Sequence, residues 1–500
     1  MEQVPNIHIE RIDDVPLFLQ HLRAMGLAEM IDAHIRPHGN WGQELSLGET
    51  IEVWLTYILS AGDHRLCAVE GRVASLEETL RHLVSPRLTP QALCDDRLAR
   101  ALRYLAQDES WRSLEEALNR HLLRVYALPG ETIRLDSSTL SVYAEVSPEG
   151  LVQFGFSKEH RPDVPQVKVA LATLDPLGMP LATLVLPGNR ADDPVYTPLV
   201  KQVHTLLGAG KLYVGDSKMA AAATRAAIQR GGDVYLCPAP RTIVPEEVVW
   251  EYVKQARQRK QIQSWQVERG DGSFLAGEGF KAAVEMRVEM EREEVVWSEE
   301  RWVLRPRWRY EEAVRQMERR LSQAEAALSA LNERGRGRRR YPTQAALAEQ
   351  VQAVLQRHQV EGLLAVTYRC EVEERSVRGY RGRPARVERR EEWFIAGVER
   401  DEKALSEMKE RLGWRVYLCN GAAQGCGMSA EMVLRAYGGQ FRVEQGFRRM
   451  RNQPIGVSPM YLHCDSHRIG LLRLFSLALR ALTLLEHVVR ETLAQQGRGL

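Results

Sequence analysis

The chain has 500 residues, enough for two to four domains, and its 44% hydrophobic and 27% charged content is that of an ordinary globular protein. A net charge of +2 does not mark the whole chain as a nucleic-acid binder, so such a function would depend on local clusters of cations. The seven cysteines form no CxxC pair, which favours a reducing cytoplasm over a disulfide framework or a cysteine-based zinc site. The N-terminus lacks a signal-peptide pattern, and the longest apolar run is too short to cross a bilayer, so we expect no membrane partner.

Residues 1–128 show the periodicity and start signals of short helices and predict an N-terminal helical domain. Capping boxes, in which a serine precedes a glutamate by three residues, predict three of the helix starts, and Thr89-Pro90 predicts a fourth. The three boxes are Ser46 with Glu49, Ser75 with Glu78, and Ser113 with Glu116. Such a bundle suits binding to DNA ends or dimerisation, and a purely structural bundle is equally compatible with the pattern.

Residues 129–237 change to a pattern of strands followed by alternating helices and strands, which predicts a mixed α/β sheet. The first strand is expected to end at Asp136, and a later one, after a helix at about 194–207, is expected to end at Asp216. If these two strands are neighbours, the two carboxylates meet at one edge of the sheet.

Residues 238–414 interrupt this pattern and are interpreted as an insertion domain. Alternating strands surround an amphipathic helical hairpin, whose first helix has a heptad stripe from Val314 to Leu331. Residues 415–500 return to the α/β pattern, with one helix expected from Ser429 to about Arg451, carrying Glu444, and another from Arg468 to about Leu493.

Asp136, Asp216 and Glu444 together predict a cluster of hard oxygen ligands suited to Mg²⁺. Two metal ions held by such acids can stabilise the attacking and leaving oxygens of a phosphoryl transfer. For any one of these acids alone, a helix N-cap or a solvated turn is the better interpretation, so the prediction depends on the three together.

These stretches resemble the DDE transposases of bacterial insertion sequences. The resemblance is carried by Asp136 in RLDSST, Asp216 in YVGDSK and Glu444 in YGGQFRVEQGFRRMR. Tyr437 and Glu444 match the tyrosine and glutamate of the Tyr-Arg-Glu-Lys signature of one large group, whereas glutamine and arginine stand at its arginine and lysine positions. The stretches FSKEHRPDVPQ and Gly188-Asn189-Arg190 are similar to the subgroup with a long N-terminal helical domain.

The resemblance implies a ribonuclease H-like core, interrupted by a β-rich insertion with a helical hairpin between the second aspartate and the glutamate. It also implies a transposase with Asp136, Asp216 and Glu444 as catalytic residues and metal ligands, and with Mg²⁺ as cofactor, which Mn²⁺ can replace. The expected partners are double-stranded DNA, as inverted-repeat ends and as target, and a second copy of the chain in a synaptic homodimer.

Several cations and one tyrosine are further candidates for DNA contact. Three of them lie on the predicted helix that carries Glu444: Tyr437, Arg448 and Arg451. Two more, Lys158 and Arg161, lie in the stretch FSKEHRPDVPQ. The last three, Arg338, Arg339 and Arg340, belong to a basic loop at 334–340. Half-buried packing for the tyrosine, and solvated charged faces or a solvated hairpin tip for the cations, are the alternatives.

Tryptophans of the insertion are candidates for stacking on a flipped end base, although ordinary core packing is the better interpretation of any single one. They are Trp250, Trp265, Trp297, Trp302 and Trp308.

Two other functions remain open: a nuclease of the same fold without strand transfer, and a non-catalytic DNA-binding protein derived from a transposase.

Overall fold

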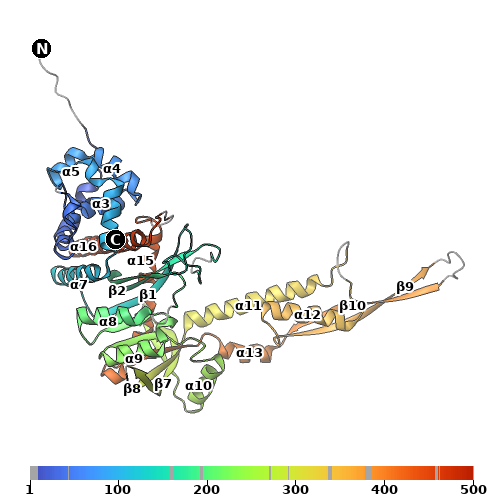
Figure 1. The fold of residues 1–500 in the computed structure, drawn as a ribbon. Coiled ribbons are helices and arrows are strands. Elements are labelled where there is room, and N and C mark those ends of the chain that lie inside the picture. Colours follow the sequence, from blue (N-terminus) through green and yellow to red (C-terminus); the bar gives the residue numbers. More distant parts are fainter. Residues whose placement is uncertain are drawn as a thin grey trace. The chain divides into compact units, whose positions relative to one another are not determined.

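The structure is a computed structural model, and it describes residues 9–42, 44–157, 161–191, 195–269, 272–290, 292–335, 340–377, 386–456, 460 and 462–498. The chain divides into two compact units (Figure 1). Unit 1 comprises Met1–Ile243, Ala282–Arg301 and Tyr417–Leu500, and unit 2 comprises Val244–Lys281 and Trp302–Val416. No helix in the described ranges has the length and apolar content needed to cross a membrane.

Unit 1 begins with a bundle of short helices. They are α1 (Val15–Ala24), α2 (Leu27–His34), α3 (Leu47–Ala61), α4 (Leu66–Ala74), α5 (Glu77–Leu83), α6 (Asp95–Leu105) and α7 (Asp108–Val125). The capping box of Ser46 and Glu49 at the start of α3 is confirmed, with both reciprocal hydrogen bonds present.

Two predicted capping boxes are wrong, and the fourth start signal begins a different kind of helix. Ser75 is the C-cap of α4, because α5 begins only at Glu77. Ser113 lies inside α7, where its hydroxyl hydrogen-bonds the ring of His34 over 2.8 Å instead of capping a helix. Thr89 precedes a short 3₁₀ helix, Pro90–Leu93. Tertiary partners that the local sequence does not reveal account for these differences.

A large mixed sheet follows the bundle and confirms the predicted α/β class. Its strands are β1 (Thr132–Ser141), β2 (Gln166–Leu174), β3 (Met179–Pro187), β4 (Leu212–Gly215), β5 (Val234–Pro238), β6 (Gln263–Arg269), β7 (Gly272–Met290), β8 (Glu293–Pro306) and β11 (Arg415–Cys419). The order is β3-β2-β1-β4-β5-β11-β8-β7-β6, and the chain passes between the units within β7 and β8. β2 runs antiparallel to β1 and β3, β4 runs parallel to β1 and β5, and β11 is antiparallel to β5.

The prediction that the first strand ends at Asp136 is wrong. β1 continues to Ser141, because residues 137–141 stay paired with β2, and the small side chains from Ser137 to Thr139 are buried. On its other side, β1 pairs with β4 only up to Leu135, opposite Gly215. Asp136 is therefore the first residue of β1 beyond the end of its parallel neighbour.

Helices cover this sheet and connect it to the bundle. α8 (Tyr196–Leu207) and α9 (Ala222–Arg230) flank β4, whereas α14 (Ala430–Gly438), α15 (Phe441–Arg451) and α16 (Asp465–Gln495) come from the end of the chain. α16 packs on α6, α3 and β3. Its Gly470 lies so close to α6 that a Cβ there would be 2.1 Å from the Leu102 carbonyl oxygen, so no larger residue fits this helix crossing.

A buried ion pair connects α16 to the bundle and the sheet. Arg480 and Glu115 are both fully buried and paired. Asn119 and Ser476 accept further hydrogen bonds from the same guanidinium, over 3.2 and 2.8 Å. The second oxygen of Glu115 accepts from the Thr183 backbone N–H of β3. Because every charge here has partners, the burial is tolerated.

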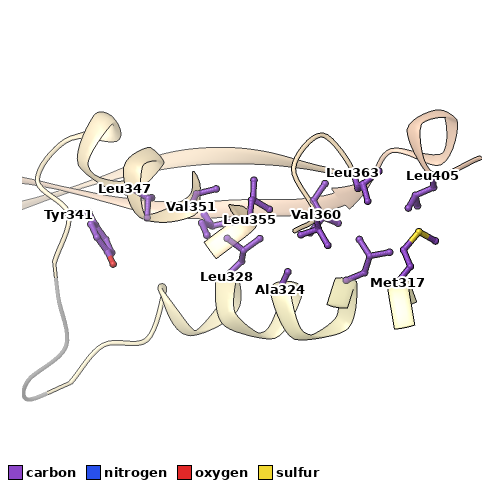
Figure 2. Close-up of a cluster of buried hydrophobic side chains, with 13 residues drawn as sticks. Met317, Ala324, Leu328, Tyr341, Leu347, Val351, Leu355, Val360, Leu363 and Leu405 are labelled. Atoms are coloured by element: carbon purple, nitrogen blue, oxygen red, sulfur yellow. The ribbon is translucent and has the colours of Figure 1, made fainter. Parts of the chain in front are cut away.

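Unit 2 has its own hydrophobic core, between a helical hairpin and a two-stranded ribbon. The hairpin consists of α11 (Arg307–Ala330) and α12 (Gln344–His358), and the antiparallel ribbon of β9 (Leu364–Val377) and β10 (Arg386–Arg400). Met317, Leu321, Ala324 and Leu328 of the predicted heptad stripe face this core (Figure 2). The sequence did not predict the helices α10 (Glu246–Gln258) and α13 (Glu402–Arg411), which also belong to unit 2.

Candidate active site

Asp136 and Asp216 lie beside each other on neighbouring parallel strands. Leu135 is in register with Gly215, and each aspartate is the next residue along its strand. Neighbouring strands are about 4.8 Å apart, so the two carboxylates leave the sheet at the same edge. The sequence left open whether these two strands are neighbours, and their pairing shows that they are.

The hydroxyl of Tyr196, the first residue of α8, contacts Asp216 and lies within electrostatic range of Asp136. It donates a hydrogen bond to Asp216 Oδ1 over 3.0 Å, and it also interacts with Ser137. Burial, together with the charges of Asp216 and Asp136, raises the pKa of Tyr196 well above its usual value. The phenol therefore stays protonated and acts as a donor to the carboxylate.

Asp216 has a second, local role. Its carboxylate accepts the Lys218 backbone N–H over 3.1 Å and so caps the short 3₁₀ helix Ser217–Ala220. Asp136 Oδ1 in turn accepts the backbone N–H of Ser137 over 2.8 Å. Each carboxylate therefore has a donor that fixes its orientation.

A break between α14 and α15 positions the third acid. The predicted continuous helix from Ser429 to Arg451 is wrong, because Gly439 and Gln440 separate two helices. A Cβ on Gly439 would lie 2.1 Å from the guanidinium of Arg134 on β1, so glycine is required at this contact.

Polar contacts attach the start of α15 to β1. Gln440 Nε2 donates to the carbonyl oxygen of Leu135 over 3.0 Å, and Gln440 Oε1 is buried without a hydrogen-bond partner in the described part of the chain. Arg134 donates to Asp175 over 2.7 Å and to the Ala436 carbonyl over 2.8 Å. The N-terminus of α15 is thereby fixed to the residue that precedes Asp136.

Glu444 follows Gln440 by four residues and so projects from the same face of α15. Its side chain is exposed and makes no hydrogen bond or ion pair with any described residue. Within the described ranges, no group of three or more histidine, cysteine, aspartate or glutamate side chains is arranged to hold a metal ion. Asp136 and Asp216 thus form a two-acid pair, and Glu444 as the third ligand stays a prediction.

The two-acid pair fits a hard divalent cation. Both groups are carboxylates, which are ligands that Mg²⁺ prefers, and both lie at one sheet edge. Two adjacent negative charges also repel each other, and a cation relieves that repulsion.

The candidate DNA contacts on α14 and α15 differ in their surroundings. The ring of Tyr437 is half-buried and packs edge-on against Tyr417 of β11, with centroids 5.1 Å apart, as the packing alternative predicts. Arg448 is exposed and has no hydrogen-bond or ion-pair partner among the described residues, whereas Arg451 is half-buried. Arg448 is thus available for a phosphate.

The other predicted cations are partly neutralised or lie outside the described residues. Arg161 forms a two-pronged ion pair with Asp163, with distances of 3.0 and 2.9 Å. Arg340 lies 3.8 Å from Glu392, which also lies 3.9 Å from Arg334. Lys158, Arg338 and Arg339 lie outside the described residues.

The insertion tryptophans are not equivalent. Trp297 is buried and donates to the Tyr235 hydroxyl over 2.8 Å, and Trp302 is also buried, so both are core residues. Trp308 is 65% exposed and remains available for stacking.

Tyr196, Arg134 and Gln440 were not predicted as site residues. A tyrosine at the start of an ordinary amphipathic helix carries no local signal of its contact with Asp216. Gln440 differs from the arginine of the family signature, and its buried contact with β1 depends on residues some 300 positions away.

The comparisons with known proteins add little to this geometry. No protein-family model matches the sequence, and no curated protein matches it. A solved piggyBac transposase, in a synaptic complex with hairpin DNA, aligns with all of this chain and 78% of its own, at 9% identity and a TM-score of 0.36. Similarity at that level does not establish a shared fold, so the function proposed below depends on the chain's own residues.

Proposed function

We propose that the protein is a DDE-type DNA transposase, which binds the inverted-repeat ends of an insertion sequence, cleaves them and transfers strands to target DNA. The observation that carries the proposal is the register of β1 and β4, which brings Asp136 beside Asp216, with the Tyr196 hydroxyl hydrogen-bonded to Asp216. The strand order, three antiparallel strands followed by two parallel ones, supports a ribonuclease H-like core.

Each residue has a defined part in the proposed site. Asp136 and Asp216 hold Mg²⁺, or Mn²⁺ in its place, with Glu444 as the third carboxylate. The bound metal supplies charge neutralisation at the scissile phosphate and a deprotonated water or 3′-hydroxyl as nucleophile. Tyr196 orients Asp216, and Arg448, one turn beyond Glu444, contacts the DNA backbone.

The decisive experiment uses single alanine variants of Asp136, Asp216 and Glu444. It measures how well each variant cleaves a plasmid that carries the DNA flanking the coding region. Metal-dependent cleavage is expected to disappear in each variant while binding to the ends persists, because phosphate contacts come from cations and the acids hold metal. Glu431→Ala is the matched control, since Glu431 is an exposed acid of α14 paired with Arg435 over 2.7 Å.

Near-normal cleavage by any of the three variants would remove that residue from the site. Joining of the cleaved 3′ ends to a second plasmid separates a transposase from a nuclease of the same fold. DNA binding without any cleavage activity in the wild type would leave only a non-catalytic DNA-binding role.

A further inference from the structure

The segment from Gln153 to Ser157 has an inverted pattern of burial. Its polar residues Gln153 and Ser157 are buried, whereas Phe154 is 54% and Phe156 is 80% exposed. Residues two apart in an extended segment share a face, and burial normally selects the aromatic face. Two aromatic rings presented to solvent by an extended segment indicate an interaction surface.

The backbone of this segment is firmly held. Gln153 and Gln166 of β2 exchange backbone hydrogen bonds of 3.0 and 2.9 Å. The buried Gln166 side chain donates to the carbonyl oxygens of Phe156 and Gly188, each over 3.0 Å. A Cβ on Gly155 would lie 2.6 Å from the Gly188 carbonyl oxygen, so the two chains are in close contact. The exposure of the rings is therefore a built feature of the fold.

A lysine places the rings near the two-acid pair. The Lys218 ammonium lies 5.9 Å from the centroid of the Phe156 ring, while the backbone N–H of Lys218 donates to Asp216 over 3.1 Å. Phe156 thus lies about one lysine side chain away from the end of β4. It has an aromatic face and a cation beside it, and the backbone of that lysine contacts Asp216.

We propose that Phe156, with Phe154 next to it, is a stacking platform for an unpaired nucleobase of a DNA strand, and that Lys218 contacts the adjoining phosphate. The inference rests on the proposed function. A base offers the flat π-surface that an exposed phenylalanine can stack on, and the phosphodiester beside it carries the charge that complements the lysine. A second copy of the chain would need no cation at this position.

The test uses a DNA duplex with a thymidine overhang and a 2-aminopurine at the junction. Wild-type protein is expected to change the probe's fluorescence on binding. Phe156→Ala should remove this change and weaken binding roughly 10-fold, and Phe156→Trp should restore both. The melting temperature of Phe156→Ala should match the wild type, because the ring is exposed. Val387→Ala is the control, as an exposed apolar residue of β10 in unit 2, and should behave like the wild type.

A photocrosslink locates the base directly. With 5-iodouracil in place of the 2-aminopurine, irradiation should join the DNA to the tryptic peptide that contains Phe156. Wild-type fluorescence in Phe156→Ala, loss of the signal in Val387→Ala instead, or a crosslink elsewhere would overturn the platform. So would a Phe156→Ala variant that changes only self-association in the absence of DNA.

Failure of the platform and failure of the proposed function give different results. If the wild type cleaves DNA and Phe156→Ala behaves identically on every probe, the platform is wrong and the transposase proposal stands. If the fluorescence change depends on Phe156 but no metal-dependent cleavage occurs, the platform stands as a single-strand binding site and the transposase proposal fails.

Discussion

The Tyr196 hydroxyl donates a hydrogen bond to Asp216 Oδ1 over 3.0 Å, from a fully buried ring at the start of α8. The same hydroxyl lies in the field of Asp136. A neutral donor to Asp216 orients that carboxylate without cancelling the charge that a metal ion would bind. This contact connects the helix that follows β3 to the edge where β4 ends.

Tyr196→Phe should therefore weaken the site while preserving the packing of the ring. We expect the free energy of unfolding of metal-free protein to fall by about 1–2 kcal/mol, because a charge-assisted hydrogen bond is lost. The midpoint of stabilisation by Mg²⁺ should move to higher concentration. Thermal melts over a Mg²⁺ series measure both effects. Tyr213→Phe is the control, since its hydroxyl makes only a 3.5 Å contact with a carbonyl oxygen. An unchanged Mg²⁺ midpoint in Tyr196→Phe would show that Tyr196 does not orient a ligand.

Two substitutions at Asp216 separate its role as a cap from its role as a ligand. Asp216→Asn keeps an oxygen that can accept from Lys218 and Tyr196, and it removes the repulsion with Asp136, so metal-free protein should melt at a higher temperature. The added stability that Mg²⁺ gives the wild type should disappear. Asp216→Ala should instead lose roughly 1–2 kcal/mol without metal, because the cap is gone and the buried Tyr196 hydroxyl loses its carboxylate acceptor.

Thermal melts of the wild type and both variants, with and without Mg²⁺, decide between the two roles. An asparagine variant that Mg²⁺ stabilises as strongly as the wild type would mean that Asp216 is a cap and not a ligand.

The sequence could predict the structural features that depend on local or periodic signals. The capping box at Ser46 and the heptad stripe of α11 need only neighbouring residues, and both are confirmed. The break at Gly439 was missed, because the close contact between Gly439 and the guanidinium of Arg134 joins residues distant in the chain. Asp136 and Asp216 were selected by residue type and pattern, but their adjacency follows from strand order, which periodicity does not specify.

Sequence patterns could not predict the ion pair of Glu115 and Arg480 either, because both look like surface residues of amphipathic helices. Glu115→Ala should lower the free energy of unfolding by about 3–5 kcal/mol, because it leaves Arg480 buried without its counter-charge. The double variant Glu115→Leu with Arg480→Met should recover most of this loss. Denaturant unfolding measures both, and Glu116→Ala, which breaks a partly exposed pair with Arg120, should cost less than about 1 kcal/mol. An equal cost at positions 115 and 116 would contradict the prediction.

Glu52 predicts a pH dependence of stability. It is buried in α3, its Oε1 lacks a hydrogen-bond partner among the described residues, and burial raises its pKa from 4.5 to about 7. Because the folded state holds the proton more tightly, this stabilisation is complete below about pH 4.5 and is lost as the pH rises through 7. The change amounts to roughly 3 kcal/mol.

Glu52→Gln should remove that contribution to the pH dependence. Urea unfolding at pH 5 and pH 8 should show a smaller loss of stability in the variant than in the wild type. The control Glu116→Gln, at a partly exposed position, should follow the wild type. A wild-type pH dependence in Glu52→Gln would mean that Glu52 is not the titrating group.

The last prediction concerns the basic loop at 334–340. Its described arginines already have counter-charges: Arg334 pairs with Glu371, and Glu392 lies within 4 Å of both Arg334 and Arg340. A neutralised arginine releases fewer counterions, so Arg334 and Arg340 should add little to the salt dependence of DNA binding in the wild type. The double variant Glu371→Gln with Glu392→Gln frees these cations. If the loop contacts DNA, binding at low salt should tighten and the dependence of log K on log salt should steepen by about one to two units.

Fluorescence anisotropy with a duplex oligonucleotide over a salt series measures the slope, with Glu431→Gln, distant in the chain, as the control. An unchanged slope in the double variant would show that the loop is a solvated hairpin tip.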